Sequence, residues 1–182
     1  RDATVDGNIG NLEMVVETVK RGYKRLGTRS KHVAMAVPTG AVITKKIIVP
    51  ASLRESELEV QVEAEANQYI PFSLDEVNLD FQVLGPAPSG EDEVEVLIAA
   101  SRKEKIEDRV AAAEAAGLKT IVMDVESYAS QTAFELICEG SSGVKESDVT
   151  VIVDIGATVT RVSVLHNSQT VYTREQQIGG HQ

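Results

Sequence analysis

The sequence predicts a mixed α/β fold in which a small subdomain is inserted into a larger core. Segments with the helical spacing of apolar residues alternate along the chain with short segments of period-two or β-branched character. Between Ala41 and Gly117, a predicted strand, helix, hairpin and second helix form a set that can pack as a layer of its own. We therefore expect a core from residues 1–40 and 118–182, with an inserted subdomain at residues 41–117.

The N-terminal part contains one amphipathic helix followed by two strands. The apolar face of the helix is formed by Leu12, Val16, Val19, Tyr23 and Leu26. Gly27 is expected to end the helix, because glycine adopts the left-handed conformation of a C-terminal cap. The segments His32–Val37 and Ala41–Val49 are rich in β-branched residues, and Pro50 ends the second of them.

The segment Ser52–Ile70 has features of both a strand and a helix. Residues 57–63 alternate as in a strand, whereas four apolar residues form a helical stripe at Leu58, Val62, Ala66 and Tyr69. Ser52 and Glu55 have the spacing of a capping box, and the segment is longer than an ordinary strand. We therefore predict a helix, whose interleaved glutamates form a solvated face.

A β-hairpin is predicted next, because apolar residues alternate over residues 77–83 and again over 94–98 around a turn from Gly85 to Gly90. A second capping-box pattern, Ser101 with Glu104, predicts a helix whose inner face includes Ile106, Val110 and Ala113. That helix is expected to end at Gly117, and a strand is predicted at Leu118–Val125.

The C-terminal third is predicted to be a helix followed by three strands. The helix covers about Glu126–Glu139, and the loop Gly140–Asp148 leads into a strand at Thr150–Asp154. A turn at Gly156 precedes two paired strands, Thr158–Leu165 and Thr170–Gln177.

Composition excludes several classes of function. The net charge of −10 argues against electrostatic attachment to nucleic acid or to an anionic lipid surface, since the one basic patch, Lys20 to Lys31, is short. Cys138 is the only cysteine, so no intrachain disulfide or zinc site is expected. His32, His166 and His181 are too dispersed for a metal site or a catalytic triad. The lack of a membrane-spanning or signal segment indicates a cytoplasmic location.

One motif suggests phosphate binding. An apolar strand, expected to be buried, ends at Asp154 and is followed by the small residues Gly156 and Ala157. Their backbone N–H groups can approach phosphate oxygens, Thr158 and Thr160 can donate hydroxyl hydrogen bonds, and Asp154 can hold Mg²⁺ through water. The order of strand, tight turn and hairpin, ending in the pair Gly179–Gly180, resembles the second phosphate loop of actin-like and sugar-kinase-like ATPases. Taken alone, the pattern fits equally well a strand-terminal aspartate in a tight turn.

Four short motifs resemble the PilM family in their order along the chain. They are Gln68–Phe72 (QYIPF), Val77–Phe81 (VNLDF), Ala99–Arg102 (AASR) and Asp154–Ala157 (DIGA). The resemblance covers almost the whole chain. It implies a fragment of an actin-like fold of the FtsA and PilM type, with a strand-helix-hairpin-helix subdomain inserted.

The resemblance also implies a function. A PilM-like chain would be a cytoplasmic scaffold of the type IV pilus assembly platform, peripheral to the inner membrane. Its partners would be the cytoplasmic N-terminus of PilN, other platform proteins and a second copy of itself, with no nucleic acid and with membrane contact only through partners. Candidate contacts to PilN are the apolar residues Tyr69, Ile70, Pro71 and Phe72, for which core packing at a helix end is the alternative.

Both ends are expected to be cut, because a PilM-like protein would begin with a first phosphate loop and finish with an adenosine-binding half. We expect ATP and Mg²⁺ to bind the full-length protein, with weak or no ATPase activity. This piece is expected to bind little or no nucleotide, and no catalytic residue is assigned. Two other functions stay open: a sugar kinase of the same superfamily, and an FtsA-like division protein with a C-terminal membrane helix.

Overall fold

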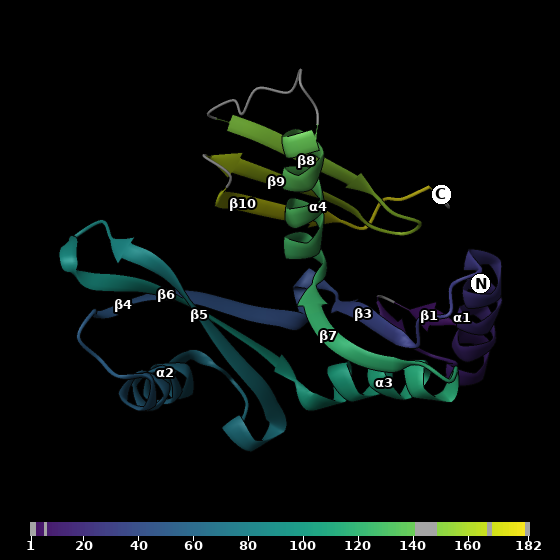
Figure 1. Cartoon of the computed structure of the whole chain (residues 1–182), viewed down its shortest axis with the longest axis horizontal. Coiled ribbons are helices and arrows are strands. Elements are labelled where there is room, and N and C mark those ends of the chain that lie inside the picture. Colours follow the sequence, from purple (N-terminus) through teal and green to yellow (C-terminus); the bar gives the residue numbers. More distant parts are fainter. Residues whose placement is uncertain (1–2, 6, 141–148, 167–168, 181–182) are drawn as a thin grey trace.

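The computed structural model describes residues 3–5, 7–140, 149–166 and 169–180 (Figure 1). Its helices are α1 (Leu12–Leu26), α2 (Glu55–Tyr69), α3 (Lys103–Ala115) and α4 (Glu126–Gly140), with short 3₁₀ turns at Thr39–Ala41 and Leu74–Glu76. Its strands are β1 (Thr4–Val5), β2 (Asn8–Ile9), β3 (His32–Val37), β4 (Val42–Pro50), β5 (Val77–Ala87), β6 (Gly90–Arg102), β7 (Lys119–Val125), β8 (Val149–Ile155), β9 (Thr160–His166) and β10 (Gln169–Gln176). The predicted loop at 140–148, the 167–168 connection and His181 lie outside the described residues, apart from Gly140.

The core is organised around a parallel pair of strands, β3 and β7. Parallel strands need a long crossover connection, and here it contains the whole of β4 to α3. Helix α1 forms as predicted: the Asn11 side chain accepts a hydrogen bond from the Met14 backbone, and Gly27 ends the helix at φ 64°. Val16 is the buried residue of its apolar face.

The inserted part is a three-stranded antiparallel sheet with the order β4-β6-β5. One face packs against α2, and the buried core between them contains Ile47, Val49, Leu58, Val62, Val96 and Ile98. The hairpin is longer than predicted, because Gly85 and Pro86 lie within β5 rather than in a turn. β5 is the edge strand of this sheet, a position where proline is tolerated because it need not donate to a neighbour.

Helix α3 connects this sheet to the core. It contacts β7, β3 and α1 on the core side and β6 on the inserted side. The division into a core of 1–40 and 118–182 and an inserted subdomain of 41–117 therefore remains a proposal. We propose that α3 is the joint between the two parts.

Both capping boxes predicted from serine are wrong. Helix α2 begins after Arg54, whose backbone N–H donates to Glu57 Oε2 at 2.9 Å, so Ser52 and Glu55 do not form the pair. Ser101 lies at the end of β6 and its hydroxyl donates to the carbonyl of Ala41 at 3.0 Å. In both cases the strand or turn before the helix runs further than the local pattern indicated.

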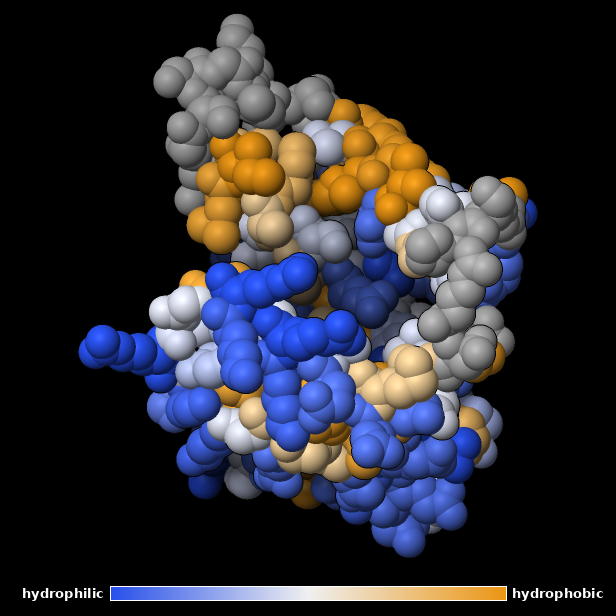
Figure 2. Space-filling view, turned by 90° about the vertical axis from the view of Figure 1, so that its right-hand side faces the viewer, coloured by the Kyte–Doolittle hydropathy of each residue, from blue (hydrophilic) through white to orange (hydrophobic). Residues whose placement is uncertain are grey.

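A second antiparallel sheet has the order β10-β9-β8. Arg161, Ser163 and Leu165 of β9 are buried on the face that α4 crosses in Figure 1. The expectation that β8 is a buried strand is wrong, since Val149, Val151, Val153 and Ile155 are between 54% and 70% exposed. They lie on the opposite face, which no described element covers. Figure 2 shows apolar side chains gathered over this upper part of the molecule.

In the part of the chain that the structure describes, no helix is both long and apolar enough to cross a bilayer.

Candidate functional site

The predicted phosphate loop is a tight turn held by backbone hydrogen bonds. The N–H of Gly156 donates to the carbonyl of Val159 at 2.9 Å, and the N–H of Gly180 donates to the carbonyl of Gly156 at 2.9 Å. Thr160 Oγ1 donates to the carbonyl of Ile178 at 2.6 Å. The structure thus brings the loop after β8 together with the segment after β10, as the sequence suggested for a two-part site.

Glycine at position 179 is required by close packing in this loop. A Cβ added to Gly179 would lie 2.5 Å from backbone atoms of Ala157 and Thr158, and this contact cannot be relieved by a side-chain rotation. We predict that Gly179→Ala lowers the free energy of unfolding by about 1–2 kcal/mol. Gly180→Ala is the matched control, because its Cβ would be 3.8 Å from the nearest atom, the Gly156 carbonyl oxygen.

Urea denaturation of both variants checks this prediction. Equal stability of the Gly179 and Gly180 variants would show that the loop is looser than described.

The loop lines an open cleft of about 780 Å³ between the core and the second sheet. Of the residues predicted for the site, Asp154, Gly156, Ala157 and Thr158 line this cleft, whereas Thr160, Gly179 and Gly180 support the loop from behind. On the other side lie Gly7 of the β1–β2 turn and Lys105 of α3. The cleft therefore combines exposed backbone with three carboxylates, of which Asp154 lies near the end of β8 and Glu126 and Glu175 contact Arg161.

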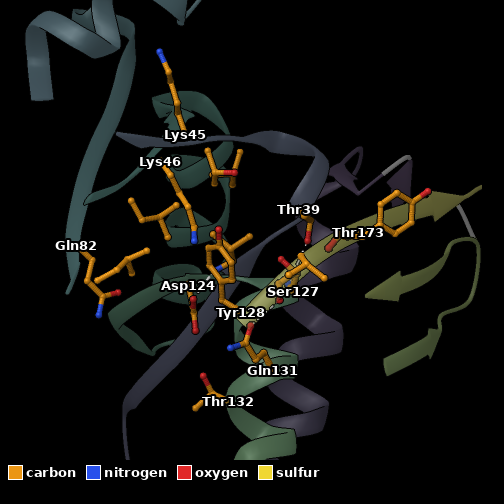
Figure 3. Close-up of a pocket in the computed structure, with 18 residues that line it drawn as sticks. Thr39, Lys45, Lys46, Gln82, Asp124, Ser127, Tyr128, Gln131, Thr132 and Thr173 are labelled. Carbon is orange, nitrogen blue, oxygen red and sulfur yellow. Dashed lines mark hydrogen bonds between the residues drawn. The ribbon is translucent and has the colours of Figure 1, made fainter. Parts of the chain in front are cut away.

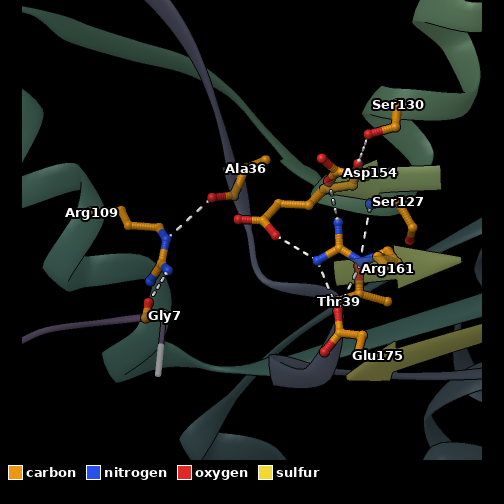
Figure 4. A network of polar contacts seen from close by, with 10 residues as sticks. Gly7, Ala36, Thr39, Arg109, Ser127, Ser130, Asp154, Arg161 and Glu175 are labelled. Carbon is orange, nitrogen blue, oxygen red and sulfur yellow. Dashed lines mark hydrogen bonds and ion pairs between the residues drawn. The ribbon is translucent and has the colours of Figure 1, made fainter. Parts of the chain in front are cut away.

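A buried arginine occupies the floor of the cleft (Figure 4). The side chain of Arg161 is 8% exposed and contacts three carboxylates: Glu126 at 2.7 Å, Glu175 at 2.7 Å and Asp154 at 3.4 Å. Burial alone lowers the pKa of Arg161, but hydrogen bonds to Glu126 and Glu175 outweigh burial and raise the pKa above its ordinary value. Arg161 thus stays charged and ties β8, β10 and the start of α4 together.

Sequence reasoning missed this network. Arg161 lies at an inward-facing position of β9, on the same face as the buried Ser163 and Leu165. A charged residue at such a position indicates that it has a partner of opposite charge. Its partners could not be identified from sequence, because Glu126 is 35 residues away.

A second arginine, Arg109, is half-buried and supports the opposite wall of the cleft. Arg109 donates to three carbonyls: Gly7 at 2.6 Å, Lys105 at 2.9 Å and Ala36 at 3.1 Å. Burial lowers the pKa of Arg109, and Glu126 and Asp108 act in the opposite direction. This side chain fixes the β1–β2 turn against α3 and the end of β3.

Among the described residues, no group of three or more His, Cys, Asp or Glu side chains is arranged to hold a metal ion. Asp154 is about half exposed and lies at the edge of the cleft. It therefore fits a cation held through water better than a cation bound directly by protein ligands.

A separate groove runs between the inserted sheet and the core (Figure 3). It consists of two adjoining cavities of about 690 and 470 Å³. They share the residues Val42, Gln82, Leu97, Asp124, Val125 and Tyr128. The groove is thus one continuous feature, and we call it the interdomain groove.

The first wall of the interdomain groove is the face of the β4-β6-β5 sheet that points away from α2. Strand register places Lys46, Leu97 and Gln82 side by side on this face. In Figure 3 Lys46 points into the cavity, whereas Lys45 points away from it. Lys46 Nζ lies 3.0 Å from Glu95, and Lys45 Nζ lies 4.3 Å from the centre of the Tyr69 ring.

The second wall comes from α4 and from β10. Tyr128, Gln131 and Thr132 share one face of α4, as expected for positions three and four residues apart. Residues 170–173 of β10 line the same cavity. β10 is one of the two edge strands of its sheet and β4 is one of the two edge strands of the inserted sheet, and residues of both strands line the groove.

The four predicted partner contacts lie elsewhere, at the end of α2. Ile70 is 6% exposed and packs with Ala66, Val77 and Ala100, and Tyr69 packs against this cluster. Burial, with a contribution from Glu65, raises the pKa of Tyr69. Phe72 is 37% exposed and lies 5.2 Å from the Arg102 guanidinium. None of the residues 69–72 lines either cavity of the groove, and their role in partner binding stays a prediction.

Known proteins of one family are similar to this chain along its whole length. The family model described as type IV pilus assembly protein PilM matches residues 1–182. The chain is similar to a solved structure described as the PilM-PilN type IV pilus biogenesis complex, with 30% identity and a TM-score of 0.78. The match covers 97% of this chain and 52% of that one, so the chain spans about half the length of that relative.

A more distant similarity concerns the fold alone. The cytoplasmic domain of EpsL, an inner-membrane component of the type II secretion system of Vibrio cholerae, is 13% identical with a TM-score of 0.55. That match covers 96% of this chain and 60% of the other. The similarity to the PilM structure confirms the predicted α/β fragment of a PilM-type fold. The sugar-kinase and FtsA-like alternatives are not favoured.

Proposed function

The chain belongs to the PilM family of type IV pilus assembly proteins, and we propose that it serves pilus assembly by holding the cytoplasmic N-terminus of PilN in the interdomain groove. The solved relative is described as a complex of PilM with PilN. The observation that carries the proposal for this chain is the groove itself, which is long, continuous and lined by both apolar and polar side chains.

The groove suits an extended peptide. Leu97, Val42 and Val125 offer apolar contacts, while Lys46, Gln131 and the threonines of β10 offer polar groups around them. The strand edges of β4 and β10 can donate and accept backbone hydrogen bonds, a common mode of peptide recognition. Binding there would bridge the inserted sheet and the core, so it would restrict motion between them.

We further propose that the phosphate cleft is one half of a nucleotide site. Ala157 and Thr158 would contact phosphate, with Gly179 and Gly180 behind them, and Asp154 would hold Mg²⁺ through water. The N–H of Gly156 already donates to the Val159 carbonyl, so Gly156 would shape the turn instead of donating to phosphate. Thr160 already donates to Ile178, so its role would be to brace the loop. In the longer protein, ATP would stabilise the arrangement of core and second sheet. We place this protein at the cytoplasmic face of the inner membrane, where PilN would recruit it alongside other platform proteins.

A fluorescence-anisotropy titration tests the main proposal. A labelled peptide copying the cytoplasmic N-terminus of PilN is titrated with this chain, beside a scrambled peptide of the same composition. Saturable binding of the first peptide alone is expected. Equal binding of the two peptides, or no binding of either, would contradict the proposal.

A further inference from the structure

We infer that the outer side of α1 and the loop after it form a docking surface for anionic lipid headgroups. This basic surface consists of Lys20, Arg21, Lys24, Arg25, Arg29 and Lys31. The inference rests on the proposed function in one respect: it takes from that proposal that a membrane is close by. All the other steps come from the charges and exposure of this surface.

Charge is strongly segregated along the chain. Residues 18–54 contain nine of the 18 lysines and arginines and no aspartate or glutamate. The remaining residues carry nine basic and all 28 acidic side chains. The net charge of −10 therefore averages over a positive segment and a strongly negative remainder, and it does not describe the electrostatics of the α1 side. The expectation that this protein does not attach electrostatically to an anionic lipid surface rested on that average.

The basic surface is exposed and mostly unpaired. All six side chains are exposed. Lys20 lies 3.4 Å from Glu17 one turn earlier in the helix. Lys31 lies over the Tyr23 ring at 4.3 Å, and within the described part of the chain Arg21, Lys24, Arg25, Arg29 and Lys31 have no carboxylate within ion-pair distance. Basic residues in the last turn of a helix offset its dipole, but this explains only Lys24 and Arg25.

The geometry allows a flat surface to reach these charges. Arg21, Lys24 and Arg25 lie on the side of α1 away from the buried Val16, whereas Lys20 follows Val16 by one helical turn. Glu17 lies between Lys24 and Arg21 on the same side. Figure 1 shows α1 at the right-hand end of the molecule, and Figure 2 views that end, where the surface below the apolar part is largely hydrophilic.

An anionic bilayer fits this surface better than nucleic acid does. Clusters of four to eight basic residues on an amphipathic helix are typical of binding to anionic lipids. Proteins that bind single-stranded nucleic acid usually offer exposed aromatic rings for base stacking, but the aromatic residue of α1, Tyr23, is half-buried and covered by Lys31.

Vesicle co-sedimentation tests the inference on this chain. Vesicles of phosphatidylcholine mixed with phosphatidylglycerol are compared with vesicles of phosphatidylcholine alone, at low and at high salt. The variant Arg21→Gln, Arg25→Gln, Arg29→Gln removes three charges while keeping helix-forming side chains within α1. The control Arg54→Gln, Arg102→Gln, Arg174→Gln removes three exposed arginines outside the basic surface.

The chain should sediment with the phosphatidylglycerol vesicles and be released by salt, since screening shortens the range of these charges. Each removed charge should weaken binding roughly fivefold, so the α1 variant should lose about 100-fold and the control much less. Equal losses in the two variants, or equal binding to both kinds of vesicle, would overturn the inference. Preference for a DNA duplex over the vesicles would also overturn it. The α1 variant should still bind the PilN peptide, which separates failure here from failure of the proposed function.

Discussion

Replacing Leu97 with lysine should lower the affinity for the PilN peptide about 100-fold, which corresponds to about 2.7 kcal/mol. Leu97 lies at the centre of the interdomain groove, since it lines both cavities and sits between Lys46 and Gln82 in the sheet. Residues at the centre of an interface carry most of the binding energy. A lysine there removes an apolar contact and adds a charge that the bound peptide would bury.

The matched control is Val83→Lys. Val83 lies in the same sheet and is 46% exposed, but it lines neither cavity of the groove. It should keep the wild-type affinity in the same anisotropy titration. If the two variants bind the peptide equally well, the peptide does not use this groove. A thermal melt shows whether each variant is folded.

Replacing Arg161 with methionine should lower the free energy of unfolding by about 3 kcal/mol. The guanidinium is the only buried cation among three carboxylates in the described network, and methionine would leave Glu126, Glu175 and Asp154 facing one another. These carboxylates are 31% to 51% exposed, so water moderates their repulsion and the loss falls at the low end of the range for buried pairs.

Arg174→Met is the matched control, because it removes a neighbouring but exposed arginine from the same hairpin. Its effect should stay within about 0.5 kcal/mol in urea denaturation. Adding Glu175→Gln to the Arg161 variant should recover part of the loss, since one of the opposed charges is then gone. A loss no larger than that of the control would show that the Arg161 network contributes little to stability.

Most of the secondary structure could be predicted from the sequence because its signals are local. The apolar stripe from Leu12 and the glycine at position 27 placed α1 correctly. The choice of a helix for residues 52–70 was also correct, although its capping box was not. Serine near a helix start is compatible with several local hydrogen bonds, and only the length of the preceding strand or turn decides among them.

The candidate sites were only partly predictable, because both depend on contacts between distant segments. The phosphate loop could be recognised since its residues are nearly contiguous. The interdomain groove draws on β4, β5, β6, α4 and β10, so it follows from the parallel pairing of β3 with β7, which positions the inserted sheet beside α4. Tyr69 and Phe72 were predicted to contact PilN because aromatic residues are rare in this sequence, yet Tyr69 packs against the core of the inserted sheet.

Photo-cross-linking of the PilN peptide tests the central claim most directly. A peptide with a photoreactive residue at successive positions is irradiated in complex with this chain, and the cross-linked residues are identified by mass spectrometry. The account predicts cross-links to residues 42, 44–46, 124–125, 127–128, 131–132 and 170–173, which line the interdomain groove. Cross-links confined to residues 69–72, or to surfaces outside the groove, would contradict it.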